Sequence, residues 1–258
     1  MNPKLYIQIN NIITRLSNNV VIFLCRLIPF FCPKACNVKD LYQLKREGYV
    51  KLYNFVNESD IANYQKNVLD ILDDINFDVK INGELQEGNI KINSLQKFST
   101  DLNKMRYKYF YVFISFFFYG FFKIPNIIFT YTSDGKIKNK YVAGQCKKQI
   151  AGDPHFDDYK NYLKILILLD DVNLNNGPTS ILPCSASNKK MQDSYIKSFE
   201  NGNRAGIVDK LLLRDISMYN RVAQLTGKKG DAFLINTKNV HWAGNMTSGN
   251  REILWLYF

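Results

Sequence analysis

The chain has little histidine, tryptophan or cysteine. Its 258 residues include two histidines, two tryptophans and five cysteines. The odd number of cysteines, with no C-x-x-C pair among them, argues against both a disulfide framework and a structural zinc site. We therefore expect a reducing, cytoplasmic setting for this protein.

Long apolar runs are also missing. The longest, Tyr109 to Phe122, has about 14 residues, whereas a membrane-spanning helix needs about 20. This run predicts a buried helix or strand instead. A second stretch, Val20 to Phe31, is interrupted by Arg26 and Pro29 and is not followed by a small-residue cleavage site, so it does not resemble a signal peptide.

Acidic residues are fewer than basic ones, with 23 against 34, and the formal net charge is +11. Such a charge favours an anionic partner. No arginine-rich run, zinc-finger spacing or RNP-type aromatic motif accompanies it, so nucleic acid is not expected. A hydrophobic content of 46% with 22% charged residues indicates an ordinary folded protein. The sequence leaves the oligomeric state open.

The first 39 residues contain no acidic residue at all. Apolar side chains recur in this segment at three- and four-residue intervals, which predicts one amphipathic helix: Leu5, Ile9, Ile12, Leu16, Val20, Phe23 and Leu27. A basic helix of this kind can lie on an anionic membrane surface. Alternatively, its apolar side packs on the protein itself or on a second subunit, and packing is the favoured alternative. Residues 1–39 are thus interpreted as a basic extension preceding one domain, 40–258.

From Val38 onward the pattern changes. The sequence predicts a short helix, a turn at Gly48, a strand over 49–55 and a second helix with Ser59 as N-cap. Residues 80–106 read as a polar, loop-rich region. Apolar strands are expected near 163–172, 179–183, 230–236 and 251–258, with a polar, helix-like insertion over 186–224. This order favours a β-sandwich or open barrel with helices packed on one side.

The two histidines occupy informative positions. His155 and Asp157 are two apart in HFD, so on an extended strand their side chains share a face. His241 follows the GDAFLIN strand, where a sheet fold can return it to the same place. Two imidazoles and one carboxylate form the facial triad of non-haem Fe(II) oxygenases.

Several further motifs surround the triad. The stretch HFDDYKNYLKILILLDDVNLNNGPTSILPCSAS contains the tripeptide Asn176-Gly177-Pro178, Gly230-Asp231 comes later, and Arg251 lies ten residues beyond His241. With these elements the chain, from about residue 40 to its end, resembles the phytanoyl-CoA dioxygenase-like family. That family has a double-stranded β-helix (jelly-roll, cupin-like) core, mainly β with flanking helices. Cys184 and Ala186 depart from the family's P-G-S-H motif.

The resemblance implies a function and a role for each residue. His155, Asp157 and His241 would bind Fe(II) and carry the catalysis, with 2-oxoglutarate and O2 as co-substrates. Arg251 would bind the far carboxylate of 2-oxoglutarate, and Lys164, which shares strand parity with Leu166 and Leu168, is a second candidate for co-substrate contact. The expected reaction is hydroxylation of a small-molecule or lipid-linked substrate, with an anionic group as one option, and release of succinate and CO2. Desaturation and ring closure stay open as alternative outcomes.

Alternatives stay open at this level. A non-catalytic jelly-roll binding protein and a membrane-surface adaptor would both fit the bulk properties. The insertion from Ser187 to Gln224 carries seven basic and four acidic residues, among them Arg204 and Arg214. It predicts a mobile lid over the site that favours an anionic substrate. Trp242 is expected to pack in the core, and Asp158 to point away from Asp157.

Overall fold

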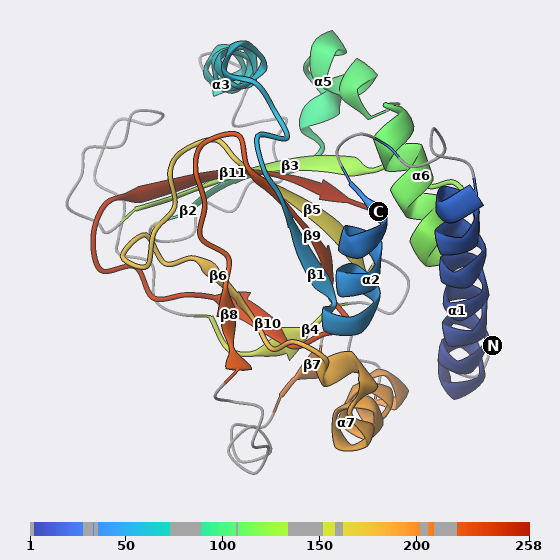
Figure 1. Cartoon of the computed structure of the whole chain (residues 1–258). Coiled ribbons are helices and arrows are strands. Elements are labelled where there is room, and N and C mark those ends of the chain that lie inside the picture. Colours follow the sequence, from blue (N-terminus) through green and yellow to red (C-terminus); the bar gives the residue numbers. More distant parts are fainter. Residues whose placement is uncertain are drawn as a thin grey trace.

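The computed structural model describes residues 3–27, 33, 36–72, 89–106, 108–133, 152–157, 162–201, 206–208 and 221–258. Two antiparallel sheets face each other (Figure 1). The larger sheet has the order β1 (Tyr49–Leu52), β9 (Ala232–Asn236), β5 (Leu163–Leu168), β11 (Asn250–Tyr257), β3 (Asn126–Ser133), β2 (Asn89–Ile92). The smaller has the order β7 (Gly206–Ile207), β4 (His155–Phe156), β10 (His241–Ala243), β6 (Thr179–Ile181), β8 (Ala223–Gln224).

The central position of strand β5 in the larger sheet explains why its sequence is apolar at almost every position. All six of its residues are buried, because the larger sheet is covered on both faces. Leu166 and Leu168 join the core between the two sheets, whereas Ile165 and Ile167 join the core beneath the helices. Lys164 has the parity of Leu166 and therefore faces the space between the sheets.

Helices cover the outer face of the larger sheet, as Figure 1 shows for α6 (Tyr109–Tyr119) and α2 (Val38–Glu47). The aromatic run forms α6 and ends at Gly120, whose φ of 72° is left-handed. Helix α7 (Lys189–Glu200) lies beside the smaller sheet, within the insertion. The predicted jelly-roll architecture with flanking helices is confirmed.

Three local predictions need correction. The first strand ends at Leu52, earlier than expected. Helix α3 (Glu58–Leu72) is capped by Asn57, whose side-chain oxygen accepts a 2.8 Å hydrogen bond from the Asp60 amide, so Ser59 lies inside the helix. Within the predicted loop-rich region 80–106, the described residues 89–106 are more regular than their polarity suggested, since they contain β2, a 3-10 turn (Leu95–Lys97) and α5 (Thr100–Met105).

The Asn-Gly-Pro motif has a structural reason. Gly177 has a φ of 63°, and a Cβ there would lie 2.7 Å from the backbone oxygen of Gly244. The turn before β6 therefore needs a glycine to pass the turn after β10 at this distance. The motif holds the smaller sheet together next to the strand that carries His241.

Helix α1 (Pro3–Leu27) has the amphipathic character expected, but it packs with the opposite face inward. Asn10, Ser17 and Asn18 are buried against the protein, together with Val21 and Ile22. The α1 stripe is the name used below for the seven apolar residues at helical spacing, and all of them are exposed: Leu5, Ile9, Ile12, Leu16, Val20, Phe23 and Leu27. Of the two packing partners expected for this stripe, its own domain is therefore wrong, whereas a second subunit stays a prediction.

Helix α1 packs with its polar side chains inward because these side chains make hydrogen bonds with the rest of the protein. Ser17 Oγ donates a 2.9 Å hydrogen bond to the Phe117 carbonyl of α6, and Thr14 Oγ1 is hydrogen bonded to the Tyr162 hydroxyl at 2.8 Å. Small and hydroxylated side chains let α1 approach α6 closely while the hydroxyl groups of Thr14 and Ser17 keep partners. Among the described residues, no helix is both long enough and apolar enough to cross a bilayer.

Candidate metal centre

The smaller sheet brings the two histidines side by side. His155 in β4 pairs directly with His241 in β10, and their ring centroids lie 4.5 Å apart. Asp157 follows β4 two residues after His155, so its side chain returns to the same face. The spacing in HFD and the antiparallel pairing of β4 with β10 thus bring together three residues that span 87 positions of the chain (241 minus 155, plus one).

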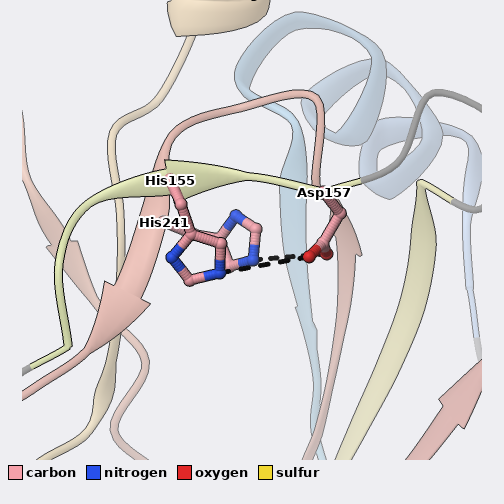
Figure 2. Close-up of side chains that lie close together, drawn as sticks. All are labelled: His155, Asp157 and His241. Carbon is pink, nitrogen blue, oxygen red and sulfur yellow. Dashed lines mark ion pairs between the residues drawn. The ribbon is translucent and has the colours of Figure 1, made fainter. Parts of the chain in front are cut away.

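Figure 2 shows both imidazole rings turned toward the carboxylate. Nε2 of His241 lies 3.3 Å from Oδ2 of Asp157, and Nε2 of His155 lies 4.0 Å from Oδ1. Donor atoms that share one transition-metal ion at about 2.1 Å lie no more than roughly 4.2 Å apart. The two measured separations fit that limit, and the three residues are grouped closely enough to hold a metal ion.

Backbone carbonyls fix the orientation of both rings. Nδ1 of His155 lies 2.8 Å from the Asp153 carbonyl, and Nδ1 of His241 lies 3.0 Å from the Asn239 carbonyl. A carbonyl can only accept a hydrogen bond, so each ring donates from Nδ1 and presents the lone pair of Nε2 toward Asp157. This is the arrangement in which histidine binds a metal through Nε2.

Electrostatics favour the metal-binding protonation states. Burial lowers the pKa of His155, and the neighbouring His241 lowers it further, so the ring stays neutral. Burial raises the pKa of the Asp157 carboxyl, but Lys164 and His241 outweigh it and hold this pKa well below its usual range. Oδ2 of Asp157 is buried, so its negative charge requires a cation close by.

Lys164 joins this group. Its Nζ lies 2.5 Å from Oδ2 of Asp157, and the side chain is almost fully buried. Burial lowers the pKa of Lys164, but Tyr257 and Asp157 outweigh that effect and raise it above its ordinary value. The inward orientation predicted from strand parity is what the structure has. Without a metal, the ammonium is the cation that compensates the buried carboxylate.

Arg251 lies apart from the four residues described so far. It is buried on the inner face of β11, six residues along the strand from Tyr257, which is the partner of Lys164. Burial lowers the pKa of its guanidinium to about 10. No contact joins Arg251 to the triad within the described residues, so its role as co-substrate anchor remains a prediction.

Two aromatic residues of the site were missed at the sequence level. The Nζ of Lys164 lies 4.2 Å from the ring centre of Tyr257 and 5.9 Å from that of Trp255. Alternation along REILWLYF places Arg251, Ile253, Trp255 and Tyr257 on one face, and this alternation could have revealed both rings. They form a cation–π wall behind the ammonium group.

Other candidates have different positions. Trp242 is half-buried and packs against the cluster of Phe156 and Leu182, as expected. Asp231 of the Gly-Asp motif does not reach the site, since it pairs with Lys51 of β1 at 2.9 Å. Asp158, Arg204 and Arg214 lie outside the described residues. Part of the insertion does reach the site, because Ile207 of β7 pairs with His155.

Two comparisons with known proteins found matches, one to a family model and one to solved structures. The model of the family Phytanoyl-CoA dioxygenase (PhyH) matches residues 148–253, and no curated protein matches. Of the solved structures, EctD from S. alaskensis, in its apo form, is 18% identical with a TM-score of 0.62, covering 84% of this chain and 74% of its own.

Two further solved structures share the fold. The epimerase SnoN, in complex with Fe3+, alpha ketoglutarate and a nogalamycin, is 13% identical with a TM-score of 0.59, over 85% of this chain and 81% of its own. HygX from Streptomyces hygroscopicus, with nickel, 2-oxoglutarate and hygromycin B bound, is 8% identical with a TM-score of 0.53, over 85% of each chain. The resemblance seen in the sequence is thus confirmed: residues 148–253, with the whole triad, match the phytanoyl-CoA dioxygenase family.

Proposed function

We propose that this protein is an Fe(II)- and 2-oxoglutarate-dependent oxygenase that hydroxylates a small-molecule substrate. The convergence of His155, Asp157 and His241 carries the proposal. Two neutral imidazoles and one ionised carboxylate bind divalent iron and leave several coordination positions open. A structural metal site would close the coordination sphere with a fourth protein ligand.

Each ligand has a task in holding such an ion. The two histidines would bind through Nε2, because Nδ1 is engaged by a backbone carbonyl in both. Asp157 would supply the one negative charge, which its depressed pKa keeps available at neutral pH. When bound, ferrous iron would activate O2 and couple substrate hydroxylation to the decarboxylation of 2-oxoglutarate to succinate and CO2.

Two cations are candidates for holding the co-substrate. We infer that Arg251 binds the far carboxylate of 2-oxoglutarate, because a buried guanidinium offers two parallel donors to a carboxylate. Lys164 would leave Asp157 when a metal takes its place and would then face the dianionic co-substrate. The rings of Trp255 and Tyr257 keep water from this ammonium and strengthen its interaction with an anion.

The substrate is proposed only by class. The insertion has a basic excess, and its strand β7 lies next to His155. Exposed Lys189, Lys190 and Lys197 of α7 belong to the same insertion. A substrate carrying a carboxylate or phosphate group would be attracted to this part of the surface.

The proposal is tested by metal binding and succinate release. His155→Ala and Asp157→Ala should each abolish the binding of Fe(II), measured by calorimetry under anaerobic conditions. Both variants should also form no succinate from 2-oxoglutarate. Arg251→Gln should keep iron binding but raise the concentration of 2-oxoglutarate needed for half-maximal turnover by a factor of 30 or more, corresponding to about 2–5 kcal/mol for a buried charged pair that loses one partner.

A matched control is Asp171→Ala. Asp171 is an exposed aspartate that pairs with Lys228 at the surface, so its loss should change neither iron binding nor succinate release. Wild-type turnover in either triad variant would refute the assignment of the metal centre. Iron binding without any succinate release in the wild-type protein would instead support a binding protein.

A further inference from the structure

The α1 stripe is an apolar surface that stays exposed to solvent in the structure. Its seven side chains have exposed fractions between 40% and 62%. Figure 1 shows α1 at the edge of the molecule, with α6 along one side of it. The stripe extends from Leu5 to Leu27, which corresponds to about 33 Å of helix. Soluble proteins rarely expose a continuous apolar surface of this length unless something binds it.

The orientation of α1 is fixed from the opposite face. Ser17 and Thr14 are hydrogen bonded to α6 and to Tyr162 at the start of β5. Val21 and Ile22 are buried in the main core. A rotation that buried the stripe would break these bonds and expose this apolar contact. The stripe is therefore held outward by the fold.

Aromatic side chains extend the apolar surface beside the middle of α1. A Cβ at Gly120 would lie 2.9 Å from Cγ2 of Ile13, so the end of α6 touches α1 at this point. The next two residues, Phe121 and Phe122, are 55% and 68% exposed. Large exposed aromatic residues next to an apolar stripe are typical of segments that enter the interfacial region of a bilayer.

Cations follow the other edge of the stripe. Arg15 and Arg26 are exposed on α1, and exposed Lys45 of α2 donates a 2.8 Å hydrogen bond to Asn19 of α1. The guanidinium of Arg26 lies 5.2 Å from the ring centre of Tyr42. No acidic residue occurs in the first 39 positions. The combination of an apolar stripe and a cationic rim complements the surface of an anionic membrane.

We propose that the protein docks on membranes that contain anionic lipids, with the α1 stripe and Phe121–Phe122 in the interface and Arg15, Arg26 and Lys45 at the headgroups. A second copy of the chain is a poorer partner for this surface. Two stripes facing each other would bring two cationic rims together, and α1 has no carboxylate to pair with them. This docking does not depend on the proposed iron chemistry.

Vesicle flotation with the full-length protein tests the docking. Wild-type protein should float with vesicles of phosphatidylcholine and phosphatidylserine and should bind phosphatidylcholine alone more weakly. Leu16→Glu should lower the partition coefficient at least about tenfold, since one buried leucine is lost and a negative charge is added. Arg15→Gln and Arg26→Gln should each lower it roughly fivefold on the anionic vesicles only.

Leu174→Glu is the matched control. Leu174 is 62% exposed, close to the 60% of Leu16, but it lies in the turn after β5. The same substitution there should leave vesicle binding unchanged, and thermal unfolding should confirm that both variants fold. Equal losses in the two variants, or no vesicle binding by the wild-type protein, would overturn the proposal. A dimer in sedimentation equilibrium that Leu16→Glu dissociates, without vesicle binding, would assign the stripe to self-association instead.

Discussion

Helices α1 and α6 lie side by side, yet their relation to water is opposite. Helix α6 buries Phe110, Phe113, Phe117 and most of its other side chains between α1 and the larger sheet. Helix α1 buries Asn10, Ser17 and Asn18 and exposes the seven apolar residues of the α1 stripe. Periodicity identifies the residues that share a helix face. It does not identify the neighbour that this face will meet.

The difference follows from which surfaces the two helices have available. Helix α6 is apolar all round, so it is stable only where apolar neighbours cover both sides. The inward face of helix α1 carries polar side chains, and α6 and Tyr162 offer them the Phe117 carbonyl and a hydroxyl. Buried hydroxyl groups can be satisfied there, and the apolar face is left for another partner.

Replacing one phenylalanine in each of the two helices should give the largest difference in the free energy of unfolding. Phe117→Ala in α6 removes a fully buried ring and should lower the free energy of unfolding by about 3–5 kcal/mol. Phe23→Ala in α1 removes a ring that is 60% exposed and should change it by less than about 0.5 kcal/mol. Urea unfolding in the absence of lipid measures both values. Similar losses would mean that α1 is packed by its apolar face in solution.

The contact between the helices should be sensitive to Gly120. This residue caps α6 with a φ of 72°, and a side chain there approaches Ile13. Gly120→Ala should cost about 1–2 kcal/mol, because alanine is disfavoured in the left-handed region. Gly120→Asn should cost less, since asparagine tolerates this conformation. If the asparagine variant is the less stable of the two in urea, contact with Ile13 sets the cost rather than the backbone.

The grouping of His155, Asp157 and His241 was the feature of the molecule that the sequence predicted best. The two-residue spacing of His155 and Asp157 fixes a common strand face, and few other placements are possible for the second histidine, His241. Strand parity also oriented Lys164 correctly. These predictions depend on local geometry, which the covalent chain determines.

What the sequence did not predict depends on contacts between distant segments. The pairing of Lys164 with Tyr257 follows from the register of β5 and β11, and the partner of Asp231 follows from the position of β1. The outward orientation of the α1 stripe depends on Ser17 meeting a carbonyl 100 residues away. None of these contacts can be inferred from periodicity, because each requires the fold to be known first.

The smallest expected effect concerns the pH dependence of α1 packing. Lys238, in the turn between β9 and β10, donates a 2.9 Å hydrogen bond to Asn11 of α1, and its ammonium lies 3.8 Å from the ring centre of Tyr162. Burial lowers the pKa of Lys238 to about 7. An unfolded lysine keeps its proton up to about pH 10.4. Above pH 7 the unfolded state therefore binds more protons than the folded state, and stability should rise with pH until about pH 10.

Part of the Lys238 side chain reaches solvent, since it also lines an open cavity beneath α1, so the rise will be much smaller than full burial would give. We expect less than about 1 kcal/mol between pH 7 and about 9, measured as the difference in urea unfolding between wild-type protein and Lys238→Gln. The variant removes only this titration and keeps a donor for Asn11. A difference between wild type and variant that stays constant over this range would mean that Lys238 stays charged against α1 in the folded state, since both states would then bind its proton up to about pH 10.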